Sequence, residues 1–264
     1  MNKLSFCKMH GLGNDFVLLN HLQQPFSLQQ VDIIALADRH CGIGFDQLLV
    51  LKPSRSADLY CQIFNADGSE AEQCGNGMRC VARYVHEEQI IAKPNLSIET
   101  RARKVQLEIK DYDHIRTNMG QAQINPQILK IIVEGSSLEL MLLSLGNPHA
   151  IYRAPSIKEI PVSQWGVQIE KQPAFSQGVN TGFMEVVNRQ AIRLRTYERG
   201  VGETLACGSN ACAAVVAGIR QTWLDSTVDV FAPGGKLLVE WKGGDSPVFL
   251  TGPAARVFKG ELSF

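Results

Sequence analysis

The chain has 264 residues, enough for one large domain or for two domains of about 130 residues, each able to bury a core. Its apolar content of 45% and its charged content of 20% are those of an ordinary soluble globular protein. The 26 basic residues balance the 26 acidic residues, so no strong net charge indicates nucleic acid or an anionic membrane as a partner.

The N-terminus and the cysteines indicate the compartment. The first residues lack the apolar stretch of a signal peptide, and the longest apolar run, Leu138 to Leu145, is far too short to span a bilayer. The seven cysteines show no spacing typical of a disulfide framework. We therefore expect reduced thiols in a cytoplasmic protein that neither crosses nor binds a membrane.

In the first half of the chain, strand patterns alternate with two helical patterns. Strands are predicted at residues 3–9, 16–20, 48–51 and 59–64, with two more within 98–109. Helices are predicted at 27–40, where apolar residues recur on one side, and at 78–90. The turn Gly11-Leu12-Gly13 lacks the third glycine of a dinucleotide-binding loop, so it gives little support to a nucleotide cofactor.

The second half repeats this mixture. Strands are predicted at residues 115–122, 138–145, 178–187, 191–197, 248–251 and 256–262, with a hairpin formed by 227–231 and 236–241. Residues 157–170 predict a short helix with loops. The helix predicted at 210–219 is apolar all round, which indicates burial on every side. A sheet wrapped around this helix would bury it.

Two stretches of the chain follow the same pattern of strand, polar loop and Cys-Gly helix start. Aligning Cys74 with Cys207 sets one register between the two halves, which we call the repeat register. Two further pairs then coincide that were not used to set it, Gly13-Asn14 with Gly146-Asn147, and Gln47 with Asn180. A period of half the chain indicates a duplicated domain and not a solenoid.

We therefore expect an α+β fold of two pseudo-symmetric domains, each a mixed β-sheet wrapped around a central helix. The predicted domains are residues 1–114, to which the C-terminal strand 253–264 returns, and residues 115–252. Two such domains would face each other with Cys74 and Cys207 near the seam, where ligand sites are common.

Each of these two cysteines precedes the first turn of a predicted helix. The unpaired N–H groups and the positive end of the helix dipole favour an anion there, and can lower a thiol pKa to roughly 3.5–7.5. Two such thiols suit removal of a proton from one face of a carbon and delivery of another to the opposite face. The helix N-termini would bind the substrate carboxylate and the charge that develops on it. Nothing in the sequence indicates a pyridoxal or nicotinamide site.

Other interpretations stay open at this point. A lone cysteine is more often a small buried residue than a reactive one. Cys74 and Cys80 are six residues apart and Cys207 and Cys212 five, which fits neither a zinc knuckle nor a thioredoxin-type motif, and we expect no metal site. Packing roles are expected for the five cysteines outside the two helix starts, Cys7, Cys41, Cys61, Cys80 and Cys212. His149 is open between a site role and an ordinary polar one. Glu198 could be a solvated charge at a strand end, but its place before Cys207 matches that of Asn65 before Cys74, which favours a site role.

Seven segments of the chain carry a family resemblance, and together they cover nearly its full length. They are His10–Phe16, Phe64–Ser69, Cys74–Arg79, Gly146–His149, Gly178–Asn180, Tyr197–Glu203 and Ala206–Gly208. In these motifs and in their order, the chain resembles the diaminopimelate epimerases. The resemblance implies cofactor-independent interconversion of LL- and meso-2,6-diaminopimelate, in lysine and peptidoglycan biosynthesis, by a homodimer whose two domains close over the substrate.

The resemblance also implies roles for individual residues. Cys74 and Cys207 correspond to the family's catalytic acid and base, with His149 and Glu198 supporting them. Ten further residues would bind substrate together with Glu198, namely Asn14, Gln47, Asn65, Gly75, Asn76, Asn147, Asn180, Arg199, Gly208 and Ser209. Arg199 suits bidentate pairing with the distal carboxylate. One departure is Asn210, where the family more often has a small residue, and no role is carried over to it.

Two alternatives use the same fold. Proline racemases share the two-cysteine chemistry, but proline has no distal amine or carboxylate that would need Asn65, Asn147, Asn180 and Arg199. A non-catalytic amino-acid-binding protein would be expected to lack one or both of the thiols at the helix starts, and both are present.

Overall fold

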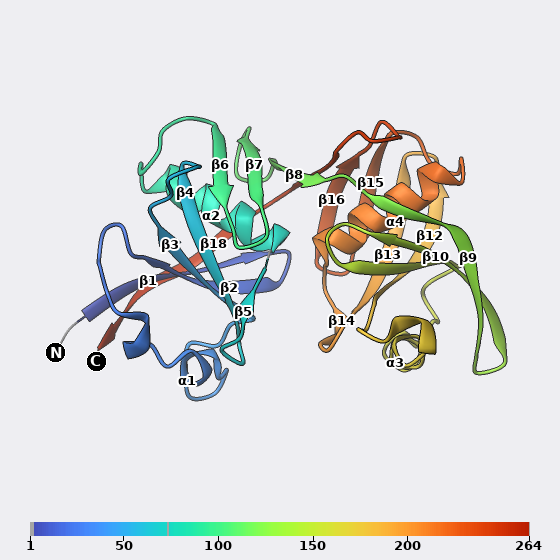
Figure 1. Cartoon of the computed structure of the whole chain (residues 1–264), viewed down its shortest axis with the longest axis horizontal. Helices are drawn as coiled ribbons and strands as arrows, with labels where there is room; N and C mark the ends of the chain where they lie inside the picture. Colours follow the sequence, from blue (N-terminus) through green and yellow to red (C-terminus); the bar gives the residue numbers. More distant parts are fainter. Residues whose placement is uncertain (1–2, 73, 264) are drawn as a thin grey trace. The chain divides into compact units, whose positions relative to one another are not determined.

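The computed structural model describes residues 3–72 and 74–263, which form two compact units. The first unit contains the residues up to Thr117 and those from Gly252 onwards, and the second contains Asn118–Thr251. The first division falls inside strand β8 (Ile115–Gly120). The chain therefore passes from the first unit to the second and returns for its last strand (Figure 1).

A mixed sheet makes up most of the first unit. Its other strands are β1 (Lys3–Gly11), β2 (Asn14–Asn20), β3 (Gln47–Lys52), β4 (Leu59–Asn65), β5 (Glu70–Ala71), β6 (Asn95–Glu99), β7 (Lys104–Ile109) and β18 (Ala255–Ser263). The order of neighbours is β18-β1-β2-β3-β4-β6-β7-β8, and β5 pairs with β4. The pairs β2–β3 and β4–β6 are parallel and the rest antiparallel.

Alternating side chains of this sheet bury two separate cores. Leu49 and Leu51 of β3 pack on the side of helix α2 (Gly75–Glu87), with Met78 and Val81 of that helix. Leu48 and Val50 of the same strand point to the other face, among the residues around helix α1 (Ile33–Ala37). Burial on both faces explains why β3 is apolar throughout and does not alternate.

The second unit repeats this arrangement strand for strand. Its strands are β9 (Gln123–Val133), β10 (Ser136–Ser144), β11 (Pro148–Arg153), β12 (Asn180–Asn188), β13 (Ala191–Glu198), β14 (Gly202–Thr204), β15 (Thr227–Ala232), β16 (Gly235–Glu240) and β17 (Val248–Gly252). The order is β9-β10-β11-β12-β13-β15-β16-β17, with β11–β12 and β13–β15 parallel.

The central helix of the second unit is α4 (Gly208–Arg220). Most of it is buried, from Gly208 to Gly218 with the exception of Ser209, as the all-round apolar pattern predicted. A second core lies on the other face of the sheet, where Phe183 and Tyr197 pack with helix α3 (Val162–Glu170). The α+β fold with a central helix in each mixed sheet is confirmed.

The strand registers of the two sheets agree with the repeat register of the sequence. In the first unit, Phe16 pairs with Gln47, and Gln47 with Asn65. In the second unit, the parallel pair is His149 with Asn180. The repeat found in the sequence is therefore also a repeat of strand pairing.

The prediction of one helix over residues 27–40 is wrong, because only short parts of this region are helical. The region contains a 3₁₀ turn, η1 (Leu28–Gln30), and the short α1. Asp32 caps α1 by accepting a hydrogen bond from the Ala35 N–H (3.0 Å), and Asp38 ends it by accepting from the N–H groups of His40 and Cys41. Cys41 follows this turn and is exposed, so its expected packing role is also wrong.

Elements without a clear sequence signal complete the fold. They are β5, β11, β14, η2 (Pro173–Phe175) and the long strand β9, none of which the pattern indicated. In the described part of the chain, no helix combines the length and apolar character needed to cross a membrane.

Candidate active site

The first half-site is built at the N-terminus of α2, where Cys74 is the N-cap residue. Its sulfur accepts a hydrogen bond from the Gly77 N–H (3.4 Å). Cys74 Sγ also lies 3.8 Å from Asn14 Oδ1, which can accept a hydrogen bond from the Cys74 thiol. Asn76, in the first turn, donates to the same Asn14 oxygen (3.2 Å). The loop between β1 and β2 and the start of α2 therefore meet at Cys74.

Arg79 lies directly behind this group and is fully buried. Its Nη2 donates to Asn76 Oδ1 (2.9 Å), and its Nε donates to the Pro253 carbonyl (3.1 Å). A Cβ atom at Gly11 would come within 3.3 Å of Arg79 Nη2. Arg79 thus fixes the orientation of the Asn76 amide, and Gly11 leaves room for the guanidinium.

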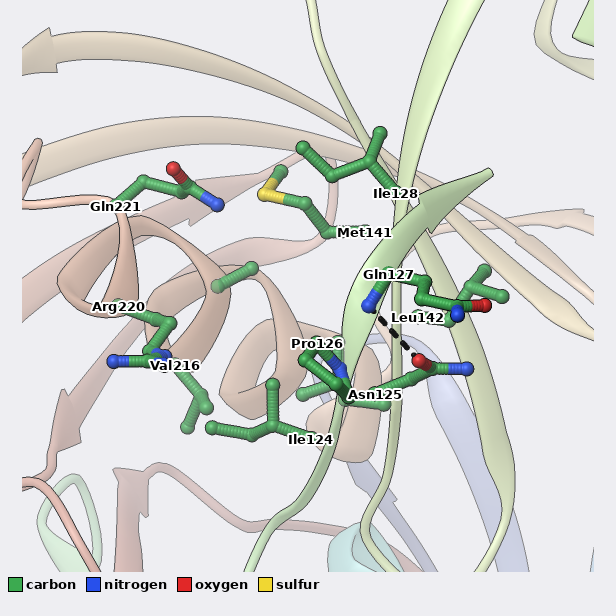
Figure 2. A pocket seen from close by; sticks show the side chains of 12 residues that line it. Ile124, Asn125, Pro126, Gln127, Ile128, Met141, Leu142, Val216, Arg220 and Gln221 are labelled. Atoms are coloured by element: carbon green, nitrogen blue, oxygen red, sulfur yellow. Dashed lines mark hydrogen bonds between the residues drawn. The ribbon is translucent and has the colours of Figure 1, made fainter. Parts of the chain in front are cut away.

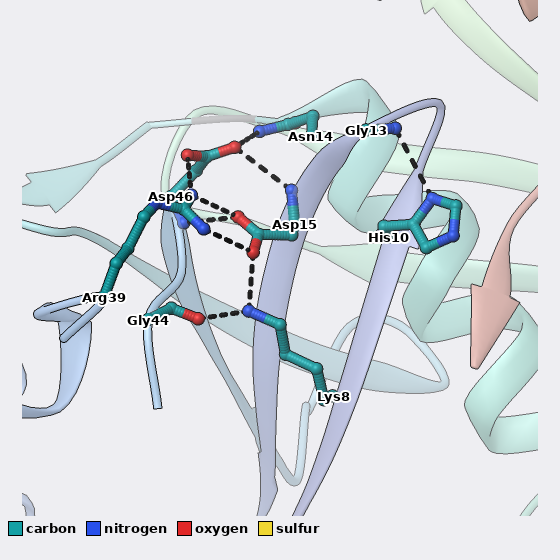
Figure 3. Close-up of polar contacts among 8 residues, drawn as sticks. All are labelled: Lys8, His10, Gly13, Asn14, Asp15, Arg39, Gly44 and Asp46. Atoms are coloured by element: carbon teal, nitrogen blue, oxygen red, sulfur yellow. Dashed lines mark hydrogen bonds and ion pairs between the residues drawn. The ribbon is translucent and has the colours of Figure 1, made fainter. Parts of the chain in front are cut away.

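Asn14 is held from its other side by four charged residues, Lys8, Asp15, Arg39 and Asp46, which we call the Asp15 cluster (Figure 3). Asp46 Oδ2 accepts from Asn14 Nδ2 (2.8 Å) and from the Asp15 N–H (3.1 Å). Arg39 pairs with both Asp15 oxygens and with Asp46. The cluster therefore holds the loop that carries Asn14.

Burial would raise the pKa of the Asp15 carboxyl, but its hydrogen bonds from Arg39 and Lys8 outweigh burial and lower the pKa to about 2. The side chains of Asp15 and Lys8 are only 14% and 10% exposed. Their ion pair (Nζ–Oδ2, 2.6 Å) is therefore shielded from solvent, and Asp15 stays ionised near neutral pH.

Two amides at the ends of neighbouring strands complete the first half-site. Gln47, which begins β3, donates from Nε2 to Oδ1 of Asn65, the last residue of β4 (2.9 Å). Asn65 in turn donates to Ser69 Oγ (3.0 Å). Gln47 Oε1 is buried and has no hydrogen-bond partner among the described residues.

The second half-site begins at Cys207, the N-cap of α4. Cys207 Sγ lies 3.4 Å from Ser209 Oγ. Burial and the nearby Glu198 carboxylate raise the pKa of the Cys207 thiol well above 9, although Ser209 and the Asn210 N–H oppose this. The lowered pKa expected from the helix N-terminus is therefore wrong for Cys207, because burial and Glu198 outweigh the helix. The sulfur is a thiol near neutral pH.

Glu198 ends β13 and accepts a hydrogen bond from Thr204 Oγ1 (2.6 Å). The next residue, Arg199, is exposed, and its Nη1 donates to the Gln177 carbonyl (2.9 Å). Asn180, at the start of β12, donates from Nδ2 to the Pro148 carbonyl and accepts from the Arg199 N–H (both 3.1 Å). These three residues lie together at the strand ends where β12 begins and β13 stops, as Gln47 and Asn65 do at the ends of β3 and β4 in the first unit.

His149 is buried beneath this edge, with 1% of its surface exposed. Its Nε2 lies 3.0 Å from Asn147 Oδ1, and Asn147 Nδ2 reaches Ser209 Oγ at 3.5 Å. Burial lowers the pKa of His149 to about 4, partly offset by its interaction with Asn210. The imidazole is therefore neutral near pH 7 and acts as a hydrogen-bonding group instead of a cation.

The predicted site residues therefore gather into one group in each unit. The first contains Asn14, Gln47, Asn65, Cys74, Gly75 and Asn76, and the second contains Asn147, His149, Asn180, Glu198, Arg199, Cys207, Gly208 and Ser209. Gly75 and Gly208 are the first residues of α2 and α4. Sequence reasoning missed Arg79, the Asp15 cluster and Asn210. For Arg79 and Asn210, a polar residue inside an otherwise buried helix was the available signal.

No group of three or more His, Cys, Asp or Glu side chains suited to a metal ion exists among residues 3–72 and 74–263. A cavity of about 270 Å³ lies elsewhere in the second unit, at the C-terminal end of α4 (Figure 2). There Asn125–Gln127 of β9 bulge away from Leu142 of β10, and Arg220 and Gln221 line the other side. None of the predicted site residues lines this cavity.

The chain matches the family model for diaminopimelate epimerase over residues 6–125 and 141–257. It is 45% identical over 272 residues to the diaminopimelate epimerase of Ectopseudomonas mendocina, covering 98% of this chain and 99% of that protein. The diaminopimelate epimerase of Chromobacterium violaceum is 46% identical over 273 residues, with the same coverage.

The chain belongs to the diaminopimelate epimerase family. The resemblance inferred from the motifs is thereby confirmed, and the family makes this protein an isomerase. Solved structures with lower identity share the fold. One is a hydroxyproline epimerase from Agrobacterium vitis, with a TM-score of 0.74 and 15% identity over 99% of this chain and 91% of that one. Another is a probable proline racemase from Agrobacterium radiobacter, with a TM-score of 0.72 and 15% identity over 98% of this chain and 93% of that one.

Proposed function

We propose that this protein interconverts LL- and meso-2,6-diaminopimelate by proton transfer at the α-carbon, with Cys74 and Cys207 as the two bases. The observation that supports this most is that each unit of a diaminopimelate epimerase family member carries one cysteine at the N-cap of its central helix. One thiol from each unit would serve one face of the carbon.

The proton balance of this reaction requires the two cysteines to be in different protonation states at any instant. The thiolate of one removes the α-proton and becomes a thiol, while the thiol of the other delivers its proton to the opposite face and becomes a thiolate. The negative charge that develops on the substrate carboxylate is stabilised by backbone N–H groups in the first turns of α2 and α4. The reverse reaction exchanges the two roles, so the protein needs no cofactor.

Glu198 suits the step in which Cys207 becomes a base. A carboxylate next to a thiol can take up the thiol proton when substrate binding excludes water. His149 is buried and neutral, so it would act by orienting Asn147 and not by its charge. Both residues therefore support Cys207 in this proposal.

The polar groups around the cysteines fit the rest of the substrate. Asn14, Asn76 and Ser209, with Gly75 and Gly208, would hold the reacting amino acid end. Gln47, Asn65, Asn147 and Asn180 would bind the distal end, with Arg199 at its carboxylate, and Glu198 would contact the substrate beside Cys207.

We further propose that the protein is a cytoplasmic homodimer that acts in lysine and peptidoglycan biosynthesis without nucleic acid or membrane partners. Support for the dimer comes from β18, which among the described residues pairs with β1 alone and on which Val257 and Phe258 are 55% and 46% exposed. Exposed edge strands with apolar residues are common sites of pairing with a second chain. Analytical ultracentrifugation across a range of concentrations would test the dimer.

Incubation with LL-diaminopimelate in deuterated water tests the reaction itself. We expect meso product and α-deuterium in both isomers. Cys74→Ala and Cys207→Ala should each abolish epimerisation while the circular dichroism spectrum is kept. Cys41→Ala is the matched control, because Cys41 is an exposed cysteine outside both half-sites. Full turnover by either of the first two variants would contradict the two-base mechanism.

A further inference from the structure

Asn210 is a fully buried amide in the first turn of α4, three residues after Cys207. Its Nδ2 lies 3.2 Å from Thr196 Oγ1, and its side chain interacts with the ring of His149. Two polar atoms in this group lack a hydrogen-bond partner among the described residues, Asn210 Oδ1 and His149 Nδ1. Orphaned polar atoms in so buried a place are costly.

The proposed role of Cys207 decides which atoms donate. With Ser209 donating to a Cys207 thiolate, Asn147 Nδ2 donates to Ser209 Oγ, and the Asn147 oxygen accepts from His149 Nε2, 3.0 Å away, so Nε2 carries the proton. A neutral imidazole has one N–H, which leaves Nδ1 as an acceptor that needs a donor. Because the two ends of an amide have the same shape, the Asn210 amide fits equally well after a half-turn. Asn210 Nδ2 then donates to His149 Nδ1, and Asn210 Oδ1 accepts from the Thr196 hydroxyl, so both orphans are satisfied.

A chain of hydrogen bonds with one direction results. The Thr196 hydroxyl donates to Asn210, Asn210 to His149, and His149 to Asn147. Asn147 then has its N–H groups free to donate to Ser209 Oγ, and Ser209 can donate its own proton to Cys207 Sγ, 3.4 Å away. Each step follows from the one before, because each side chain accepts one hydrogen bond and donates the next.

We propose that Asn210 is a positioning residue that selects the Nε2–H tautomer of His149 and thereby directs the Ser209 hydroxyl proton onto the Cys207 thiolate. This inference rests on the proposed role of Cys207 as a base. With the other tautomer, His149 Nε2 would accept from the Asn147 amide, which would turn its oxygen towards Ser209. Ser209 would then donate to Asn147, and the thiolate would lose a donor.

The equivalent position in the first unit has no amide that could play this role. In the repeat register, Gly77 corresponds to Asn210 and Phe16 corresponds to His149. Neither residue has a polar side chain, and the two are neighbours, since a Cβ atom at Gly77 would lie 3.3 Å from Phe16 Cε1. Cys74 instead faces the acceptor oxygen of Asn14. A change at Asn210 should therefore affect Cys207 and leave Cys74 unchanged.

Nitrogen-15 NMR of the histidine ring tests the tautomer directly and needs no turnover. The chain has six histidines, so His149→Gln identifies the signal by its loss. We expect the unsubstituted protein at neutral pH to show a neutral His149 with the proton on Nε2. An Nδ1–H tautomer or an imidazolium would overturn the proposal, whatever substrate the enzyme uses.

Asn210→Asp keeps the shape of the side chain but replaces the donor by a carboxylate, which can only accept when ionised. We expect the His149 proton to move to Nδ1 or a second proton to be bound there. We also expect kcat to fall at least about tenfold, the loss expected for one hydrogen bond to a charged group. KM should change less than kcat. An unchanged tautomer, or a changed tautomer with unchanged kcat, would overturn the proposal.

The rate of alkylation by iodoacetamide, followed by peptide mapping across pH, separates the two cysteines. In Asn210→Asp and in Asn210→Ala, the pH at which Cys207 becomes reactive should rise, and that of Cys74 should stay the same. Glu198 is the charged group next to Cys207 and is present in all variants, so it cannot cause the difference. Asn210→Ala adds no charge, so its shift is free of the effect of the new carboxylate in Asn210→Asp. Thr181→Val is the matched control, because it removes another buried hydroxyl of the second unit without touching the chain of hydrogen bonds. Equal shifts at both cysteines would indicate a general structural effect and would contradict the proposal. Failure of the unsubstituted enzyme to epimerise diaminopimelate would count against the proposed function alone.

Discussion

Replacing Asp15 with Asn should weaken the first unit by an amount that the structure allows us to calculate. Asp15 is bound by Lys8 and by Arg39, and its side chain is 14% exposed. These partners overcome the effect of burial and lower the pKa of Asp15 from 3.8 to about 2. At about 1.36 kcal/mol for each tenfold change in proton affinity, the folded state is stabilised by about 2.4 kcal/mol when this carboxyl ionises.

The sign of the pH dependence follows from the direction of that change. The folded pKa lies below the unfolded one, so the stabilisation is fully present above about pH 4 and is lost as the pH falls towards 2. Asp15→Asn should therefore lose about 2.4 kcal/mol at neutral pH and progressively less in acid. Lys8, left buried without its partner in this variant, adds to the loss at neutral pH.

Urea unfolding followed by circular dichroism, at neutral pH and at several values between about 4 and 2, measures this difference. The exposed Asp113, in a loop of the same unit, gives the control variant Asp113→Asn. Activity should fall as well, because the cluster holds Asn14 through Asp46. A gap between Asp15→Asn and the unsubstituted protein that stays constant down to pH 2 would refute the reasoning, as would a loss no larger than that of the control.

Two further predictions concern the half-sites. Arg199→Lys should raise KM for diaminopimelate by about tenfold or more, because the bidentate fork is lost while the charge is kept. Gly178→Ala should act in the same way, since its Cβ would lie 2.6 Å from Arg199 Cδ, and steady-state kinetics that leave kcat/KM unchanged in Arg199→Lys would make Arg199 an ordinary surface charge. The proposed mechanism needs both thiols at one α-carbon, so it predicts that mild oxidation inactivates the enzyme reversibly by a disulfide between Cys74 and Cys207. Peptide mapping before and after dithiothreitol checks this, and inactivation through another pair of cysteines would contradict it.

The sequence predicted the parts of the fold that depend on local pattern. Strand alternation, the all-round apolar helix α4 and the repeat register each follow from side-chain periodicity, and the structure has them. The helix at 27–40 was overpredicted because Asp32 and Asp38 bond to nearby backbone N–H groups, which periodicity does not reveal. Strand β9 was missed since most of its residues are exposed and few alternate.

The positions of the candidate site residues were predictable where the local pattern sets them. The cysteines at the helix starts and the amides at strand ends could be found from the sequence. The Asp15 cluster could not, because Lys8, Arg39 and Asp46 come from three different segments and meet only in the folded chain. The raised pKa of Cys207 was missed for the same reason, since it depends on burial and on a carboxylate from β13.

The departures from the internal repeat occur where the proposed reaction treats the two halves of its substrate differently. The repeat register sets Ala66 against Arg199, and Asn65 against Glu198. A site with two equal halves would offer two equivalent places for the distal end of diaminopimelate. In the proposed function, the single guanidinium of Arg199 removes that equivalence, and the Glu198 carboxylate raises the pKa of the Cys207 thiol. The duplicated fold thus supplies two similar helix starts, and in the proposed function a few unmatched side chains of the second unit determine where the distal end binds.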